Sequence, residues 1–206
     1  MALRTQIVQQ FRQPHGLLGR VAGWIMANRP SNRERNRWTL ALLELKPGDR
    51  VLEIGFGPGF AMAEASKLLP DGKVYGIDHS ATMLAQASTR NARAITEGRV
   101  QLRCGDATDL SWLPSPVDKI WSNNVVQFWA DPAAVFTALH RTLKPGGRVA
   151  TTYQPRHRNA TAADSNRMAA SLQSVLGRCG FENIRVERLP LDPPVVCVLA
   201  QRPLDH

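Results

Sequence analysis

The sequence predicts an α/β fold in which helices cover both faces of a mostly parallel sheet. Apolar, strand-like runs alternate with helical patterns along most of the 206 residues. A glycine-rich turn, residues 55–59, directly follows the first of these runs. Near the C-terminus, two strand-like runs follow each other with no helix between them. Such alternation is typical of doubly wound sheets, because each crossover helix packs on a face of the sheet.

The length and texture of the chain indicate one domain with an N-terminal extension. A chain of 206 residues that is 43% hydrophobic and 21% charged has room for one sizeable core. Prolines and glycines break residues 1–30 into short amphipathic pieces, and we expect a helical lid or extension there. Residues 31–206 should form the main domain. Its first helix is expected to have Ser31 as its N-cap and to end at Pro47-Gly48.

Hydrophobic periodicity assigns the remaining elements in order. Strands are expected at residues 50–54, 74–78, 100–104, 119–122 and 148–153. Helices are expected at residues 61–69, 81–95, 133–143 and 165–176. Two further strands, residues 184–189 and 195–200, are separated only by residues 190–194. This gap permits a hairpin and excludes a right-handed crossover, so one of these two strands must be antiparallel.

Composition excludes several classes of protein and leaves two interpretations of the charge. The three cysteines are far apart and match no metal or disulfide spacing, so we expect no metal and a reducing, cytoplasmic location. We expect no transmembrane segment, because no apolar run is long enough to span a bilayer. The net charge of +9 suits an anionic partner, such as nucleic acid, acidic lipid or an acidic substrate. We favour the alternative of a basic enzyme that binds no polyanion.

Three acidic residues stand at the ends of three successive predicted strands. Glu53 lies directly before the glycine turn, where a carboxylate would repel a pyrophosphate and attract the sulfonium and ammonium groups of S-adenosylmethionine (SAM). Asp78 follows the last glycine by about twenty residues, the spacing at which a carboxylate accepts both ribose hydroxyls of an adenosine. Its alternative role is helix capping, for which Ser80 is also available. Asp106 could accept a hydrogen bond from the adenine amino group.

Together these segments resemble the class I SAM-dependent methyltransferases, particularly the small-molecule branch similar to ubiquinone and menaquinone biosynthesis methyltransferases. The matching motifs, in order, are residues 53–59, 76–84, 105–107, 117–124 and 143–148. The resemblance covers roughly residues 38–200. It implies a Rossmann-like sheet of seven strands with the last strand antiparallel, and SAM as the cofactor with S-adenosylhomocysteine (SAH) as its product.

The resemblance also implies roles for individual residues. The methionine part of SAM is expected beside Glu53, Gly55, Phe56, Gly57 and Gly59. Asp78 is expected to hold the ribose. The adenine is expected between His79, Met83, Asp106 and Ala107, with Asn123 closing the site. His79 departs from the small or apolar residue that is usual in the family.

The acceptor should bind beyond the fourth and fifth strands, because ligands of open α/β sheets bind outside the carboxyl ends of the strands. The candidate acceptor-binding residues are Trp24, Met26, Gln127, Phe128, Trp129, Tyr153 and His157. Trp38 is expected to pack against the domain instead. Methyl transfer is an in-line displacement that requires positioning and shielding from water, so no acid or base is obligatory. For a phenol or thiol, the candidate bases are His157, Tyr153 and His15.

Three functions remain open on the sequence. The preferred one is methyl transfer to a small-molecule acceptor, and the residues after the fourth strand, Ser122-Asn123-Asn124-Val125, lack the Asn-Pro-Pro-Tyr sequence of certain amino methyltransferases. A methyltransferase that acts on RNA or an anionic lipid is the second, although the chain has no appended RNA-binding module and few aromatic residues for base stacking. A catalytically silent SAM-binding protein is the third. The sequence leaves the oligomeric state open.

Overall fold

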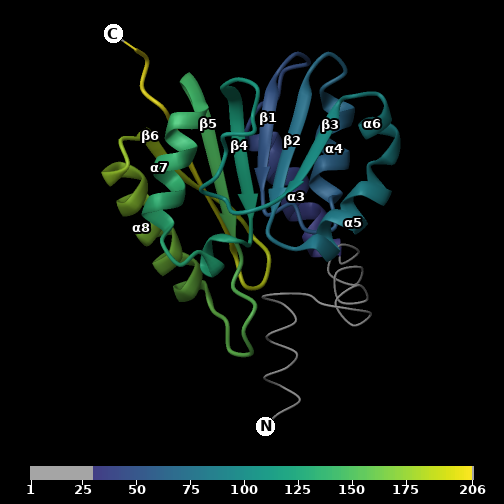
Figure 1. Ribbon diagram of the computed structural model, residues 1–206. Coiled ribbons are helices and arrows are strands. Elements are labelled where there is room, and N and C mark those ends of the chain that lie inside the picture. The colour runs from purple at the N-terminus through teal and green to yellow at the C-terminus, as the bar shows by residue number, and fades with distance from the viewer. Residues whose placement is uncertain (1–29, 206) are drawn as a thin grey trace.

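The computed structural model describes residues 30–205 as a seven-stranded sheet flanked by helices (Figure 1). The strands are β1 (Arg50–Ile54), β2 (Lys73–Asp78), β3 (Val100–Cys104), β4 (Val117–Asn123), β5 (Leu143–Tyr153), β6 (Glu182–Leu189) and β7 (Val195–Gln201). The helices are α3 (Pro30–Leu42), α4 (Phe60–Leu68), α5 (Ala81–Arg90), α6 (Ala92–Thr96), α7 (Pro132–Thr142) and α8 (Ala162–Arg178), with a short 3₁₀ helix η1 (Val126–Phe128). The predicted α/β class and strand number are confirmed.

The sheet has the strand order β3-β2-β1-β4-β5-β7-β6. Strands β1 to β5 are parallel where they pair, whereas β7 is antiparallel to both β5 and β6. The hairpin of β6 and β7 confirms the antiparallel strand that the short gap at residues 190–194 required. The expected extension at residues 1–30 lies, apart from Pro30, outside the described residues.

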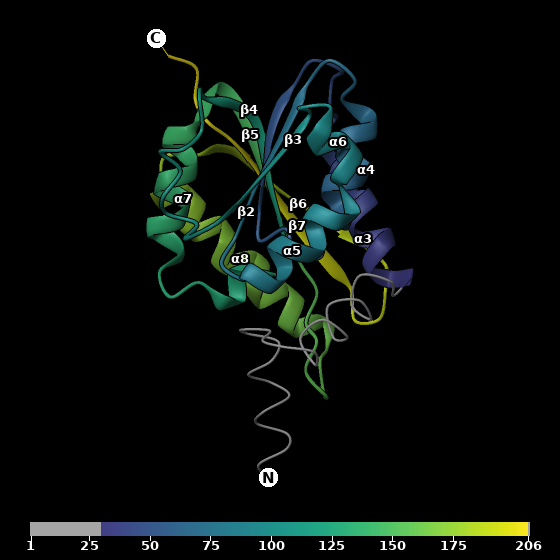
Figure 2. The same cartoon turned by 45° about the vertical axis from the view of Figure 1, so that its right-hand side comes forward.

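Helices cover both faces of the sheet (Figure 2). Helices α3, α4, α5 and α6 pack on one face against side chains such as Val51, Val74 and Trp121. Helices α7 and α8 pack on the other face, against the strand residues adjacent to these three, namely Leu52, Tyr75 and Ile120. Adjacent residues of a strand point to opposite faces of the sheet. Because helices cover both faces, the central strands are continuous apolar runs.

Two predicted helices differ most from the structure. Ser31 lies inside α3 instead of capping it, since Pro30 already begins the helix, and α3 ends at Leu42 because the chain leaves helical geometry at Glu44, whose φ is 53°. The helix expected at residues 81–95 is interrupted at Asn91. This buried side chain donates to the carbonyls of Gly59 and Ala87, and such bonds to the backbone compete with a continuous helix.

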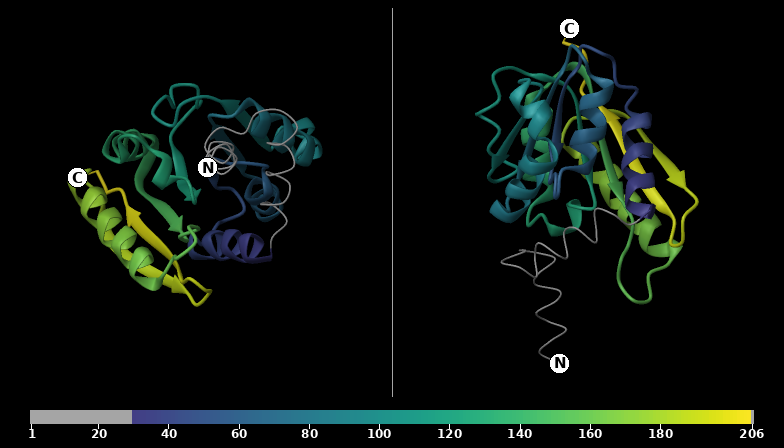
Figure 3. Two further views of the ribbon diagram at one scale, coloured as in Figure 1. Left: turned by 90° about the horizontal axis from the view of Figure 1, so that it is seen from below. Right: turned by 90° about the vertical axis from the view of Figure 1, so that its right-hand side faces the viewer.

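The carboxyl ends of the five parallel strands lie at one end of the sheet, here called the sheet edge, which is seen from below in the left view of Figure 3. The loops that leave this edge carry the glycine turn, Asp78, Asp106 and Asn123. Helix α3 lies beside the ends of β4 and β5 at the same edge. Within residues 30–205, no helix is long and apolar enough to cross a bilayer.

Candidate functional site

The glycine turn after β1 contains two glycines that packing requires and one that faces open space. A Cβ atom on Gly55 would lie 2.3 Å from Val125 Cγ1, and one on Gly59 would lie 2.8 Å from Ala87 Cβ. A Cβ on Gly57 would meet no atom within 4 Å. All three have positive φ, between 51° and 77°. The backbone at Gly57 is therefore open to a ligand, which can approach closely because this residue has no side chain.

Glu53 is a buried carboxyl group that has no counter-ion among residues 30–205. Its side chain is only 2% exposed, and its Oε2 has no hydrogen-bond partner among the described residues. Burial raises the pKa of Glu53 well above its ordinary value, and the negative charge of Asp78 adds to the rise, while Trp121 and the backbone of Met62 oppose it. A cationic group placed beside this carboxyl would favour its ionised form.

Asp78 connects the loops that follow β1 and β2. Its Oδ2 accepts a hydrogen bond of 2.8 Å from the Gly57 backbone, and its Oδ1 accepts one of 2.9 Å from the Ser80 backbone. Burial raises the pKa of Asp78, and these two amides and His79 oppose the rise. Ser80 caps α5 through its own hydroxyl, which accepts from the Met83 backbone. Capping of α5 by a side chain therefore does not require Asp78.

The residues expected around an adenine differ in accessibility. Asp106 and His79 are exposed, whereas Met83 is buried in the core and Ala107 is half-buried. Asp106 accepts hydrogen bonds from the hydroxyl and the backbone amide of Thr108, and these bonds lower its pKa. Asp106 is thus held as a carboxylate that faces solvent. Phe56 is also buried, and its ring lies against Gly76. A ligand could therefore contact the backbone of Phe56 and not its ring.

Asn123, at the end of β4, is bonded to α3. Its Nδ2 donates to Asn36 Oδ1 at 2.9 Å, and its Oδ1 accepts from the Thr39 hydroxyl at 2.9 Å. The same hydroxyl lies 2.7 Å from that of Thr152 on β5. Helix α3 thus packs on the ends of β4 and β5 through polar side chains, and Asn123 holds it there through these two hydrogen bonds.

The polar face of α3 is a structural feature that the sequence did not predict. Its buried members are Arg35, Asn36 and Thr39, and only Leu40 among the buried residues of the helix is apolar. Arg35 Nη1 donates to Gln154 Oε1 at 3.0 Å, directly after β5. The sequence does contain a signal for this face. Arg35 and Thr39 are four residues apart and therefore lie on the same side of a helix as Asn36, and the apolar pattern of this segment begins only at Trp38.

The candidate acceptor residues divide between surface and core. Phe128 is 45% exposed, whereas Trp129 packs edge-to-face on Phe136 with ring centroids 5.4 Å apart. Gln127 is half-buried and donates to the Asn124 carbonyl. Trp38 packs against the core as expected. His15, Trp24 and Met26 lie outside the described residues.

The two described candidate bases lie near the end of β5 and the start of α8. His157 is exposed, and its Nε2 lies 3.4 Å from Asp164 Oδ2. Tyr153 is half-buried, and burial raises its pKa, as does the charge of Asp164, while Arg167 opposes both. Tyr153 is therefore a protonated donor at neutral pH, and His157 is the better placed of the two to accept a proton.

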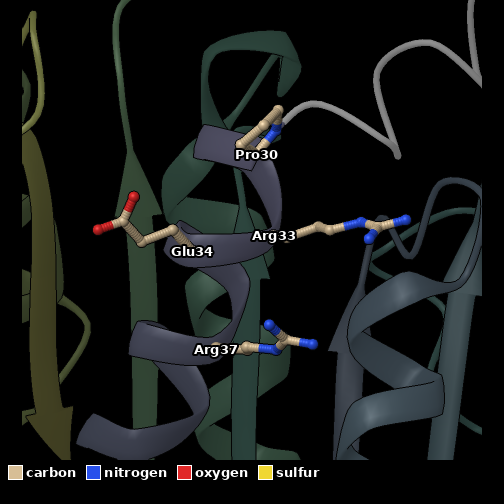
Figure 4. A pocket seen from close by; sticks show the side chains of 4 residues that line it. All are labelled: Pro30, Arg33, Glu34 and Arg37. Atoms are coloured by element: carbon tan, nitrogen blue, oxygen red, sulfur yellow. The ribbon is translucent and has the colours of Figure 1, made fainter.

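A basic surface adjoins the glycine turn. A shallow pocket on α3 is lined by Pro30, Arg33, Glu34 and Arg37 (Figure 4). Arg33 and Arg37 point to the same side of the helix, and Glu34 points to the other. Their guanidinium carbons lie 5.6 Å and 5.7 Å from the centre of the Phe60 ring, at the start of α4. These two cations border the site without belonging to its buried part.

Comparison with known families and sequences agrees with this geometry. Residues 52–151 match a family described as "Methyltransferase domain". The chain is 34% identical over 184 residues to the uncharacterized methyltransferase YdaC of Bacillus subtilis (strain 168), covering 89% of this chain and 98% of that protein. It is 31% identical to the demethylmenaquinone methyltransferase of Symbiobacterium thermophilum over 55% of this chain, which spans 45% of the relative.

Solved structures show the same fold. The N-methyltransferase NodS of Bradyrhizobium japonicum WM9, in complex with SAH, has a TM-score of 0.69 at 19% identity, with 87% of this chain and 91% of that chain covered. The [4+2]-cyclase SpnF has a TM-score of 0.70 at 18% identity, with 84% and 82% covered. Similarity at this level concerns the fold alone, and SpnF is named for a reaction other than methyl transfer.

Proposed function

Since this chain belongs to the class I SAM-dependent methyltransferases, we propose that it transfers the methyl group of SAM to a small organic acceptor. The observation that carries the proposal is the polar packing of α3 on the carboxyl ends of β4 and β5, through Asn123 and Thr152. This packing covers the carboxyl ends of β4 and β5, where an acceptor would bind. A covered site suits a small molecule and keeps water from the reacting atoms.

The residues at the ends of β1, β2 and β3 fit the cofactor. The open backbone at Gly57 would lie along its amino-acid part, and the buried Glu53 carboxyl, with its unpartnered Oε2, would face the cationic groups. Asp78 would accept the ribose hydroxyls, and Asp106 would accept the adenine amino group. When bound, SAM supplies a methyl carbon that its sulfonium has already activated for displacement.

The remaining chemistry concerns position and protons. Helix α3 excludes water, and the ends of β4 and β5 orient the acceptor at near-attack distance. A phenol or thiol acceptor must lose a proton, and His157 is the base that we propose, because its imidazole lies near the end of β5, where Asp164 Oδ2 is 3.4 Å from its Nε2. Tyr153 would orient the acceptor by donating a hydrogen bond. An amine that is already uncharged needs no base.

The relatives support an acceptor of low molecular weight. Those that the chain matches over about half its length include an arsenite methyltransferase, a demethylmenaquinone methyltransferase and a trans-aconitate 2-methyltransferase. The chain spans 28%, 45% and 45% of these three proteins, respectively. Their names agree in methyl transfer and differ in the acceptor, so the similarity supports the class of reaction.

A second candidate is methylation of RNA or of an anionic lipid. The observation that favours it is the exposed pair Arg33 and Arg37 beside the glycine turn, in a chain of net charge +9. Retention on heparin and on RNA at increasing salt measures this property, because phosphate contacts weaken steeply with salt concentration. Steep salt dependence together with RNA-dependent SAH release would favour this candidate over the small acceptor.

The test is a screen of phenols, quinols, thiols, amines and carboxylic acids with SAM, with SAH release as the readout. We expect release that depends on at least one small acceptor and that Asp78→Ala slows by about five- to a hundredfold at limiting SAM. The exposed Asp71→Ala variant should match the unchanged protein. Release only with RNA or lipid vesicles would contradict the proposal, and SAH binding without release from any acceptor would identify a silent SAM-binding protein.

A further inference from the structure

Arg35 is a buried arginine whose hydrogen-bond partners are uncharged. Only 4% of the residue is exposed, and its Nε has no hydrogen-bond partner among residues 30–205. Nη1 donates to the side-chain oxygen of Gln154, and Nη2 contacts that of Asn32. Both are amide oxygens. The guanidinium is therefore withdrawn from water without a carboxylate to compensate its charge, a costly arrangement for a fold alone.

The chain has no evident counter-ion to offer. Within the described part, no aspartate or glutamate forms an ion pair with Arg35, and no nearby carboxylate raises its pKa. Residues 1–29 contain no aspartate or glutamate at all, and they carry Arg4, Arg12, Arg20 and Arg29. An acidic side chain from that segment therefore cannot complete the pair.

A second cation increases the local positive potential. Arg156 lies in the loop after β5, close enough that its charge, after burial, lowers the pKa of Arg35 to about 9. Gln154, between β5 and this loop, is fixed on both sides: its Nε2 donates to the Pro193 carbonyl, and its backbone amide donates to Asn124 Oδ1. Gln154 therefore connects Arg35 to the start of the loop that carries Arg156.

We propose that Arg35 and Arg156 bind a carboxylate or phosphate group of the acceptor, so that the enzyme acts on an anionic small molecule. The inference rests on the proposed function. A guanidinium presents its N–H donors in a planar fork that matches such groups, and Nε is a buried donor that has no hydrogen-bond partner among residues 30–205. The anion would supply the compensating charge that residues 30–205 do not provide.

The location favours the acceptor over the cofactor as the source of this anion. Arg35 reaches Gln154 at the end of β5, whereas Glu53, Gly57 and Asp78 follow β1 and β2. In the sheet, β4 and β5 lie on the other side of β1 from β2 and β3. The exposed Arg33 and Arg37 are the cations of α3 that adjoin the glycine turn.

The test uses the full chain saturated with SAH, and malonate as the anionic probe. Melting temperature is measured against sodium malonate and against sodium chloride at matched ionic strength, because a ligand of the native state stabilises it by mass action. We expect saturable stabilisation by malonate beyond that by chloride. Arg35→Gln should weaken malonate binding by about ten- to a hundredfold, the scale of a lost charge-assisted hydrogen bond. The exposed Arg178→Gln on α8 is the matched control and should behave as the unchanged protein.

If Arg35→Gln does not fold, Arg156→Gln provides the test. Arg156 is exposed, so its replacement should leave the fold intact. It should weaken malonate binding several-fold and leave SAH binding unchanged. Equal malonate responses in the unchanged protein, Arg156→Gln and every folded Arg35 variant would overturn the proposal. So would a lower affinity of Arg35→Gln for SAH with no loss for 5′-methylthioadenosine, which lacks the amino-acid carboxylate, because Arg35 would then serve the cofactor.

Turnover separates this proposal from the proposed function. Each acceptor is compared with its uncharged amide, and we expect kcat/KM to favour the acid by at least about tenfold. Arg35→Gln, or Arg156→Gln in its place, should reduce that preference. Methylation of neutral acceptors alone would overturn the anionic acceptor and leave the proposed function intact. Absence of SAH release with every small molecule would instead overturn the proposed function, while the malonate titration would still report on the anion site.

Discussion

The backbone amide of Gly57 donates a hydrogen bond of 2.8 Å to Oδ2 of Asp78 and so joins the loops that leave β1 and β2. The one glycine of the turn that faces open space is thus fixed to the acid expected to hold the ribose. A carboxylate has about four acceptor positions. Asp78 can therefore keep its bonds to Gly57 and Ser80 while accepting ribose hydroxyls, so the site is ordered before the cofactor binds.

Replacement of Asp78 by alanine should weaken SAH binding by about 1–3 kcal/mol, the scale of hydrogen bonds to a charged acceptor. Asp78→Asn should lose less, because one oxygen remains to accept from Gly57. Isothermal titration calorimetry measures both dissociation constants, with the exposed Asp71→Asn as the control. An unchanged dissociation constant for Asp78→Ala would show that the residue serves only the loops.

Glu53 should make stability depend on pH. Its folded-state pKa is raised above the unfolded value of about 4.3, so the native state retains a proton that the unfolded chain has lost. Stability therefore falls as the pH rises from about 4.3 towards the folded-state pKa. Glu53→Gln should remove this decline and be more stable at pH 8 by about 1–3 kcal/mol.

Urea unfolding at pH 5 and pH 8 measures the difference between the Glu53→Gln variant and the unchanged protein. The same variant should lose several-fold of any preference for SAM over SAH, because the sulfonium charge distinguishes the two ligands. Parallel pH profiles for the two proteins would exclude a protonated Glu53. An unaltered preference for SAM would place the sulfonium elsewhere.

Two alanine substitutions in the glycine turn should affect different properties, one mainly SAH binding and the other mainly stability. Gly57→Ala adds a Cβ in open space and should reduce stability by only about 1–2 kcal/mol, the cost of its positive φ, while SAH affinity falls more than about tenfold. Gly59→Ala adds a Cβ at 2.6 Å from Asn91 Nδ2 and should destabilise the fold by about 2–5 kcal/mol. Thermal melting and SAH titration of both variants distinguish these effects, and equal SAH affinity in Gly57→Ala and the unchanged protein would contradict the cofactor position.

The strands and the glycine turn could be predicted because their signals are local. Apolar runs of four or five residues predict β1, β2 and β4, and three closely spaced glycines predict the turn, without knowledge of the fold. The C-terminal hairpin followed from the length of one gap. The break at Asn91 could not be read in this way, because its side chain bonds to Gly59, in a loop 32 residues earlier.

The contacts of α3 were beyond sequence reasoning for the same physical reason. Thr39 meets Asn123 and Thr152 across separations of 84 and 113 residues, and Arg35 meets Gln154 across 119. A buried polar face also contradicts the expectation that a helix packs through apolar side chains. Only the assembled strand ends show which polar residues of α3 are paired and that Arg35 has no charged partner within the described part of the chain.

Deletion of residues 1–28 should leave SAH binding nearly unchanged, because every residue to which we assign the cofactor lies beyond Arg50. We propose, from the apolar residues and breaks of that segment, that it covers the acceptor, so turnover should fall steeply through lost positioning. Calorimetry with SAH and a turnover assay on the best acceptor of the screen measure the two effects. Loss of folding or of SAH binding in the truncated protein would show that the segment belongs to the core or to the cofactor site.

A crystal structure of the SAH complex tests the central claim most directly, because it locates the ligand against the named residues. We expect the ribose hydroxyls within hydrogen-bond distance of the Asp78 carboxylate and the adenine beside Asp106. The amino-acid part should lie along Gly57, near Glu53. Ligand density at the ends of β1, β2 and β3 in this orientation is the predicted result. SAH bound elsewhere, or with its ribose hydroxyls out of reach of Asp78, would contradict the account.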